Sequence, residues 1–166
     1  MSSRVSAGIL LYRWRRHPPE ANEPGLEVLL GHPGGPFWLH RDLGHWTILK
    51  GEVEEGEDLL SVARREFQEE AGSPAPAGEP LPLGAVRQKG GKLVHAWALE
   101  GDLDPVTVRS NTFSIEWPPG SGQQREFPEI DRLAWFPADE ARRRIKEAQA
   151  VFIDRLEGAL AARARS

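Results

Sequence analysis

The sequence predicts an α/β fold in which helices pack on a mixed β-sheet. Apolar runs of strand length alternate with loops rich in glycine and proline, and the apolar period changes twice from 2 to about 3.6 residues. The first change begins a helix over residues 58–71, and the second begins helices after Pro137. The chain has 166 residues, 39% hydrophobic and 28% charged, which is enough for a real core. We therefore expect one domain over residues 1–166.

The first half of the chain predicts three strands followed by a helix. Residues 5–12 are apolar almost throughout, which indicates a strand buried on both faces. Residues 26–30 and 46–49 predict two further strands, and we expect the second of these to end where a Lys-Gly pair follows. The helix over residues 58–71 should end at Gly72, because glycine commonly closes helices and two prolines follow it.

The second half predicts further strands and then helices. Residues 73–82 are rich in proline, and we interpret them as a surface loop because each flank alone has too few strands to bury both faces of a sheet. Gly90 and Gly91 indicate the turn of a hairpin. The predicted elements are strands over 83–87, 92–99, 111–117 and 133–136, a loop over 118–124, and two helices after Pro137 with a break near 147–150.

Composition excludes several classes of protein. The formal charge of −4 argues against a protein whose main task is stable nucleic-acid binding, because that task needs a basic face. The absence of cysteine excludes disulfides, zinc-thiolate sites and thiol nucleophiles. The apolar run ending at Tyr12 is too short for a signal peptide or a membrane span, so we expect a cytoplasmic protein with no membrane association.

Three carboxylates lie close together on the first predicted helix. At 100° per residue, Glu66, Glu69 and Glu70 share an arc of roughly 100° beside the face that packs on the core. Clustered glutamates usually form a solvated surface, but at the edge of a buried face they repel one another unless a cation neutralises them. Mg²⁺ or Mn²⁺ is the natural occupant, because carboxylate oxygens are hard ligands. Arg65 lies beside the arc and can hold a carboxylate in a fixed position.

The wider spacing around this helix resembles the signature of the Nudix hydrolases. The resemblance is tight over residues 51–73 and loose over most of the remaining chain. The matching positions are Gly51, five residues, Glu57, seven residues, Arg65-Glu66-Phe67, one residue, Glu69-Glu70, one residue and Gly72. The sequence departs from the family pattern at Leu49, Phe67 and Ser73. These departures change packing and remove no ligand.

The resemblance implies an α/β/α sandwich that cleaves a diphosphate linked to another moiety and uses Mg²⁺ or Mn²⁺. By the same resemblance, Glu66, Glu69 and Glu70 are the metal-binding carboxylates, and Glu66 and Glu69 belong to the catalytic group. The carbonyl of Lys50 or Gly51 is a further possible ligand. Glu57 and Arg65 are implied to be a supporting pair within the catalytic group.

The residue that deprotonates the attacking water lies either in this motif or in a later loop. Glu116, Glu126 and Glu129 are the later candidates, and we favour Glu129 because it precedes the Trp-Phe end of a late strand, where family members often carry an extra acidic ligand. The alternative for Glu129 is an ordinary exposed loop glutamate.

Substrate contacts are expected from basic and aromatic side chains. Lys50 and Arg87 are candidates for phosphate binding, and Lys50 is favoured because it adjoins the motif. Trp46 and Trp117 are flanked by loop residues and are candidates for stacking on a nucleobase, although core packing is the commoner role of any tryptophan. The long segment over residues 31–46 is a candidate lid or specificity loop.

The predicted activity is hydrolysis of a nucleotide-type diphosphate, either a nucleoside triphosphate or a dinucleoside polyphosphate, by direct attack of water on phosphorus. The sequence resembles a subgroup of predicted nucleoside triphosphate pyrophosphohydrolases. A non-nucleotide diphosphate such as a diphosphoinositol polyphosphate is the alternative substrate, and a non-catalytic binding module is the alternative class. The expected partner is a small-molecule diphosphate, and we expect a monomer or a homodimer.

Overall fold

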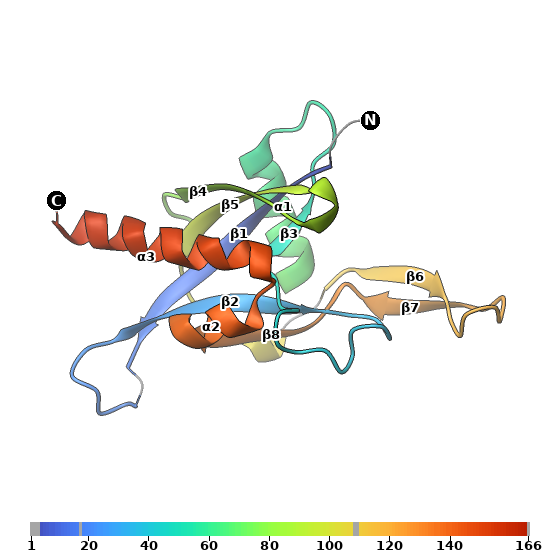
Figure 1. Cartoon of the computed structure of the whole chain (residues 1–166), viewed down its shortest axis with the longest axis horizontal. Coiled ribbons are helices and arrows are strands. Elements are labelled where there is room, and N and C mark those ends of the chain that lie inside the picture. The colour runs from blue at the N-terminus through green and yellow to red at the C-terminus, as the bar shows by residue number, and fades with distance from the viewer. Residues whose placement is uncertain (1–3, 17, 108–109, 166) are drawn as a thin grey trace.

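The computed structural model describes residues 4–16, 18–107 and 110–165. Within these residues the chain forms a six-stranded mixed sheet, a separate two-stranded hairpin and helices on both faces of the sheet (Figure 1). The strands are β1 (Val5–Arg15), β2 (Gly25–Pro33), β3 (Leu49–Glu52), β4 (Leu81–Arg87), β5 (Leu93–Glu100), β6 (Thr112–Glu116), β7 (Gln124–Pro128) and β8 (Ile130–Pro137). The helices are α1 (Leu59–Ala71), α2 (Ala138–Arg144) and α3 (Ala150–Arg165), with short 3-10 turns η1 (Lys89–Gly91), η2 (Pro105–Thr107) and η3 (Glu147–Gln149). The α/β class with a mixed sheet is confirmed.

Strand β1 is the centre of the sheet. It runs parallel to β5 on one edge, and on the other edge it pairs antiparallel with β3 in its first half and with β2 in its second half. Seven consecutive residues of β1, from Ser6 to Tyr12, are buried, as expected for a strand covered on both faces. Gly8 lies opposite Lys50, and a Cβ at Gly8 would lie 2.5 Å from the carbonyl oxygen of Leu49. The glycine therefore allows β3 to approach β1.

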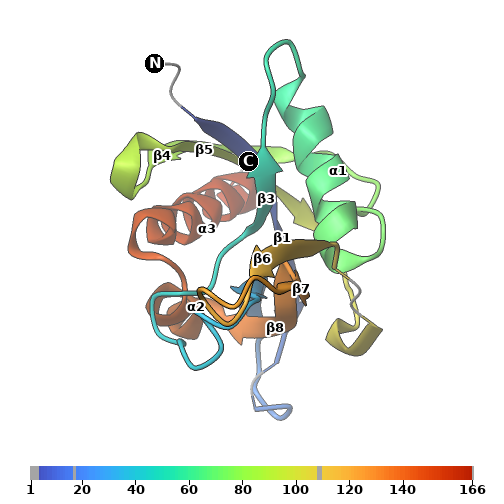
Figure 2. The ribbon, with the colours of Figure 1, turned by 90° about the vertical axis from the view of Figure 1, so that its right-hand side faces the viewer.

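Two apolar cores lie on the two faces of the sheet. Helix α1 covers one face, and Phe67 and Val62 of this helix pack on Ile9 and Leu11 of β1. Helices α2 and α3 cover the opposite face, where Phe152 is the largest fully buried side chain. Figure 2 shows α1 and α3 on opposite sides of the strands. This layering is the α/β/α sandwich that the sequence predicts.

The ends of α1 follow from its capping residues. The carboxylate of Asp58 accepts a hydrogen bond from the backbone N–H of Ser61 at 3.0 Å, which satisfies one free donor of the first turn. Gly72 has φ of 78°, a left-handed conformation that glycine adopts without strain, and its N–H donates to the carbonyl of Gln68. The predicted helix and its end are confirmed.

Three strand predictions need correction. The third strand is displaced: it runs from Leu49 to Glu52, because the Lys-Gly pair forms ladder pairs with β1, whereas Trp46 and Thr47 form only isolated bridges. Strand β7 is not predicted, because a polar segment that ends in proline has no apolar alternation to reveal it, and its first residue, Gln124, falls in the preceding predicted loop. Strand β8 begins three residues earlier than expected. In the part of the chain that is described, no helix has the length and apolar character needed to cross a bilayer.

Candidate active site

The carboxylate-bearing face of α1 lies directly against β3. Glu70 is buried, and its Oε1 accepts a hydrogen bond from the backbone N–H of Lys50 at 3.0 Å. The carboxylate of Glu66 occupies the space beside the Cα of Gly51, where a Cβ would lie only 2.1 Å from Cδ and Oε2 of Glu66. Glycine is therefore required at position 51 for Glu66 to lie at this edge of the sheet.

Glu129 joins the carboxylates of α1. Its N–H donates to the carbonyl of Asn111, and the N–H of Asn111 donates to the carbonyl of Glu69, so the start of β8 is held against the end of α1. Glu129 is an exposed residue, but partial desolvation of its carboxyl, followed by repulsion from Glu69, raises the pKa of Glu129 above its ordinary value. The structure thus places Glu129 near the carboxylates of α1. Glu116 and Glu126 instead lie on the β6–β7 hairpin, where the carboxylate of Glu116 accepts from the N–H of Gly120.

The electrostatics of the cluster show the repulsion that the helix geometry predicts. Burial raises the pKa of Glu66, and repulsion from Glu69 and Glu129 adds to the effect. Burial raises the pKa of Glu70 to about 8, although the hydrogen bond from Lys50 lowers it. A solvated acidic surface would not shift the pKa values in this way, because water would stabilise the charged forms. The carboxylates of Glu66 and Glu70 therefore lie in partly desolvated surroundings.

Glu57 and Arg65 form an ion pair. Nη1 of Arg65 lies 2.7 Å from Oε2 of Glu57, and Oε1 of Glu57 accepts the N–H of Glu54 at 2.8 Å. Nη2 of Arg65 also lies 3.7 Å from Oε1 of Glu66. The arginine beside Glu57 lowers the pKa of that carboxyl. The pair joins the loop before α1 to the carboxylate face of the helix.

The donor set fits a hard divalent cation. Glu66, Glu69, Glu70 and Glu129 supply carboxylate oxygens, and the raised pKa values of Glu66, Glu70 and Glu129 show that their negative charge is poorly compensated by protein groups. Among the described residues, no three acidic or histidine side chains already surround one point, so the carboxylates would have to close around the ion.

Lys50 lies between this cluster and the other face of the sheet. Its backbone N–H binds Glu70, whereas its ammonium group is buried near Lys92 and Lys146. Burial, reinforced by these two lysines, lowers the pKa of Lys50 to about 8. The structure therefore places a buried amine immediately behind the carboxylate site, and the contact of Lys50 with a substrate phosphate stays a prediction.

The predictions for the aromatic substrate contacts are only partly compatible with the structure. Base stacking by Trp46 is wrong for this structure: its ring is 3% exposed, its Nε1–H donates to Asp42 at 2.8 Å, and it packs edge-on against His32 and Phe136. Trp117 is half-buried and packs edge-on against Phe37, with ring centroids 5.4 Å apart. Trp46 is therefore a core residue, whereas Trp117 keeps a partly exposed ring.

Arg87 lies away from the carboxylates, on the α3 side of β3. It is exposed, donates from Nη1 to the carbonyl of Gly91, and lines a groove of about 810 Å³. Trp38 lines the same groove. The sequence did not single it out as a candidate substrate contact, because nothing local distinguishes it from neighbouring loop residues. The available signal was its position in the long loop already singled out as a candidate specificity segment.

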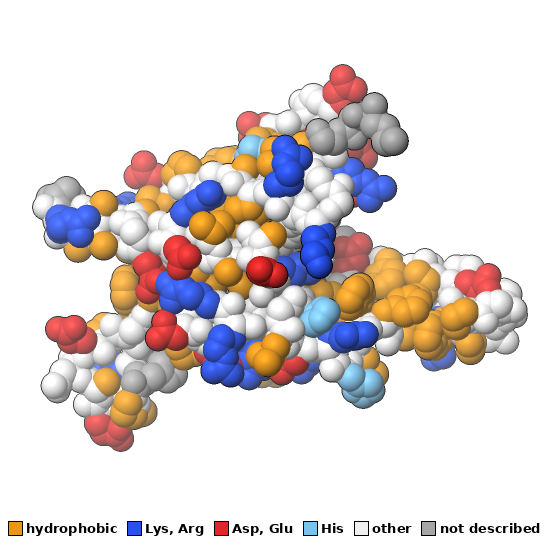
Figure 3. Space-filling model, viewed as in Figure 1, with side chains coloured by type: hydrophobic (Ala, Val, Ile, Leu, Met, Phe, Trp, Pro, Cys, Tyr) orange, Lys and Arg blue, Asp and Glu red, His pale blue; other side chains and the backbone are white. Residues whose placement is uncertain are grey.

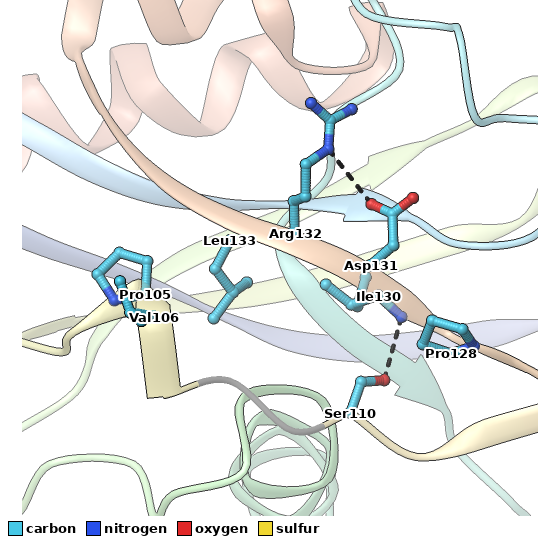
Figure 4. Close-up of a pocket in the computed structure, with 8 residues that line it drawn as sticks. All are labelled: Pro105, Val106, Ser110, Pro128, Ile130, Asp131, Arg132 and Leu133. Carbon is cyan, nitrogen blue, oxygen red and sulfur yellow. Dashed lines mark hydrogen bonds and ion pairs between the residues drawn. The ribbon is translucent and has the colours of Figure 1, made fainter.

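Another hollow, of about 560 Å³, lies between η2 and β8 (Figure 4). Its charged groups already bind one another: Nε of Arg132 lies 3.6 Å from Oδ1 of Asp131, which also lies 2.8 Å from Nδ1 of the buried His32. Ser110 accepts the N–H of Ile130 at 3.0 Å. This hollow lacks free convergent groups among the described residues and does not include the carboxylates.

Together, the layered fold and the carboxylate helix at the edge of β3 define the class of α/β/α domains with a candidate diphosphate-hydrolase site. The NUDIX domain family matches residues 6–156, and the chain belongs to this family. It is 44% identical over 61 residues to an RNA pyrophosphohydrolase of Caulobacter vibrioides, a match that covers 34% of each chain. It is 39% identical over 67 residues to the asymmetrical bis(5'-nucleosyl)-tetraphosphatase of Sus scrofa, covering 40% of this chain and 41% of that protein. These matches thus span about a third to two-fifths of the relatives' lengths.

Solved structures agree with the family assignment at the level of the fold. The binary complex of an Ap4A hydrolase from C. elegans matches with a TM-score of 0.60 and 23% identity over 96% of this chain and 98% of that chain. A mutT/nudix family protein from Listeria innocua matches with a TM-score of 0.63 and 16% identity, over 98% and 97% of the two chains. The Nudix fold predicted from the sequence is confirmed.

Proposed function

We propose that this protein is a Nudix pyrophosphohydrolase that hydrolyses the diphosphate linkage of a nucleotide-type substrate with the help of Mg²⁺ or Mn²⁺. The observation that carries the proposal is that Glu66, Glu69, Glu70 and Glu129 lie near enough to repel one another, beside the buried Lys50. A diphosphate is polyanionic, so the carboxylates need a cation to accept it, and Lys50 adds positive charge. The names of the two curated relatives favour a nucleotide as the substrate.

The residues divide into distinct roles. Glu66, Glu69 and Glu70 would hold the metal ion, with the carbonyl of Lys50 or Gly51 as a further ligand. The bound ion would neutralise charge on the phosphoryl oxygens and lower the pKa of water. The ion pair of Arg65 with Glu57 would hold the loop before α1 in a fixed position against the helix. These roles follow the family resemblance and agree with the contacts of each side chain.

Glu129 is the proposed general base. It comes from a different segment than the metal-holding carboxylates, and partial desolvation raises its pKa, which improves its ability to take a proton near neutral pH. The proton of the attacking water would pass to Glu129 while water attacks phosphorus directly. No covalent intermediate with the protein is required.

A substrate panel tests this proposal. Release of phosphate, pyrophosphate and nucleoside phosphates is measured for nucleoside triphosphates, dinucleoside polyphosphates and a diphosphoinositol polyphosphate, with Mg²⁺ and Mn²⁺ separately. We expect metal-dependent cleavage of a nucleotide. Preference for the diphosphoinositol compound would contradict the nucleotide assignment, and binding without turnover of any diphosphate would indicate a binding module instead.

Metal binding is measured independently through the melting temperature. A ligand that binds only the folded state at 100 times its Kd stabilises that state by about 2.7 kcal/mol. We expect Mg²⁺ or Mn²⁺ to raise the Tm of the wild type and EDTA to reverse the shift. A Tm that does not respond to millimolar divalent cation would refute the metal site.

A further inference from the structure

A groove of about 810 Å³ lies on the α3 side of β3, opposite the carboxylates. Three segments that are distant in the sequence line it: the loop after β2, the β4–β5 turn and the link between α2 and α3. Figure 1 shows these three segments facing the viewer, and the space-filling view from the same side shows basic side chains gathered on this face (Figure 3). The volume is suitable for a nucleotide-sized ligand.

The groove has an excess of positive charge. Arg87, Lys89 and Lys146 line it, against the single carboxylate of Glu147. Within the described residues, no carboxylate lies within ion-pair distance of these three cations. Burial, followed by repulsion from the nearby Lys92, lowers the pKa of Lys146, so positive charge at this end of the groove is poorly compensated. A bound polyanion would relieve this repulsion.

Trp38 supplies an aromatic surface at the same groove. Its side chain is 42% exposed, and its ring lies 5.7 Å from the ring of His45 at an interplanar angle of 41°. The other two tryptophans considered as substrate contacts do not line this groove. Trp46 is buried in the core, and Trp117 packs on Phe37. Trp38 is thus an available aromatic ring beside unpaired cations.

The loop that carries Trp38 is anchored at Arg41 and Asp42, which lie between Trp38 and His45 in the sequence. Asp42 accepts the indole N–H of Trp46 at 2.8 Å and binds Nη1 of Arg144 through both carboxylate oxygens, each at 2.7 Å. Nε2 of the buried His32 lies 2.5 Å from the carbonyl oxygen of Arg41. These contacts hold the loop in place without a ligand, which lowers the entropy cost of binding.

The groove and the carboxylates are neighbours across β3. Lys50 joins them, because its N–H contacts Glu70 while its ammonium group lies near Lys146. Among the described strands, β3 pairs with β1 on one edge, and no strand pairs with its other edge.

We infer that Trp38 is the platform on which the base of the nucleotide substrate stacks, and that the phosphate chain runs past Lys89 and Lys146 toward Lys50 and the carboxylates. This assignment rests on the proposed function. Stacking on an aromatic ring tolerates any base, because every base has a π-face. Trp38 is therefore a binding residue that favours nucleotides over diphosphates without a ring, and it contributes no proton transfer.

The test compares Trp38→Ala with a matched control in the same loop. Phe37→Ala removes an aromatic ring that is even more exposed (59%) but does not line the groove. KM and kcat are measured for ATP, and for inorganic tripolyphosphate, which has phosphates but no ring. We expect Trp38→Ala to raise KM for ATP by roughly 5- to 150-fold, the range for removing one base–aromatic stack, with kcat and tripolyphosphate kinetics nearly unchanged. Trp38→Phe should retain most of the affinity, and Phe37→Ala should resemble the wild type.

Calorimetric binding of ATP and tripolyphosphate to the same proteins separates this inference from the proposed function. If the wild type binds ATP in a Trp38-dependent way but cleaves no diphosphate, the inference stands and the proposed function fails. If Trp38→Ala loses affinity for ATP and for tripolyphosphate to the same extent, the ring only supports the loop. Unchanged ATP binding in this variant, or no ATP binding by the wild type, would overturn the inference.

Discussion

The backbone N–H of Lys50 donates a hydrogen bond to Oε1 of Glu70 across 3.0 Å. This contact joins β3 to the last carboxylate of α1, so the loop and the helix of the Nudix motif are held together even without a metal ion. It also orients one carboxylate oxygen toward the protein. The other oxygen remains for the proposed metal ion, so Glu70 would combine a structural role with a metal-binding role.

Glu70→Gln is expected to separate these two roles. The glutamine carbonyl oxygen can still accept the N–H of Lys50, and glutamine cannot acquire the negative charge that burial and the neighbouring Glu129 and Glu66 disfavour at this position. The metal-free variant should therefore be at least as stable as the wild type. Its kcat at saturating metal should fall by roughly 10²–10³-fold, corresponding to a few kcal/mol of lost transition-state stabilisation. Near wild-type turnover would contradict the assignment, and Glu79→Gln, at an exposed position, is the charge-matched control.

The metal-free protein should become less stable as the pH rises from 5 to 8. Burial raises the pKa of Glu70 from 4.5 to about 8, so the stability gained from the protonated form is complete below pH 4.5 and is lost as the pH rises through 8. Each pKa unit corresponds to about 1.4 kcal/mol, so the effect is on the order of a few kcal/mol. The lowered pKa of Lys50 makes the stability depend on pH only between about pH 8 and 10.5, so Lys50 does not contribute to the change between pH 5 and 8.

Chemical denaturation in EDTA at several pH values measures this dependence. Glu70→Gln should flatten the profile between pH 5 and 8, because glutamine does not titrate. A profile of the same slope in both proteins would show that Glu70 is not the group responsible.

Gly51→Ala is expected to impair activity while leaving the fold intact. The new Cβ would lie 2.1 Å from the Glu66 carboxylate, and this flexible group can move aside at little cost in stability. Displacement of a catalytic group by about 1 Å can cost on the order of 10²-fold in rate. The measurement is kcat together with Tm. Gly78→Ala is the control because a Cβ there meets nothing within 4 Å, and a fully active Gly51→Ala enzyme would show that the position of Glu66 is unimportant.

Arg65→Ala is expected to weaken metal-dependent activity through Glu57 and Glu66. Removing a partner that orients metal ligands typically costs 10–100-fold in metal affinity or activity. Arg65→Lys should recover only part of the loss, because lysine lacks the planar fork of donors. Titration of activity with Mg²⁺ checks this prediction, with the neighbouring Arg64→Ala as the control. If Arg65→Ala and Arg64→Ala behave alike, Arg65 has no special role.

The sequence alone was sufficient for the local features of the site. The arc of Glu66, Glu69 and Glu70 follows from the helical period, and the ends of α1 follow from Asp58 and Gly72, because these interactions join residues only three or four positions apart. The pairing of Glu57 with Arg65 follows from the motif, because a residue just before a helix can reach only side chains on the first turns of that helix. The alternation of strands and helices was enough for the α/β class.

Only the tertiary structure decided which distant residues meet at the site. Glu129 approaches Glu69 through backbone bonds at Asn111, which no local pattern specifies. Trp46 and Trp38 have similar loop-like surroundings in the sequence, yet the first packs between His32 and Phe136 and the second stays exposed beside Lys146. Burial of a side chain depends on which segments fold against it, and this long-range information is absent from spacing and periodicity. The motif was therefore determined by the sequence, while the partners of the motif depend on the packing of the whole chain.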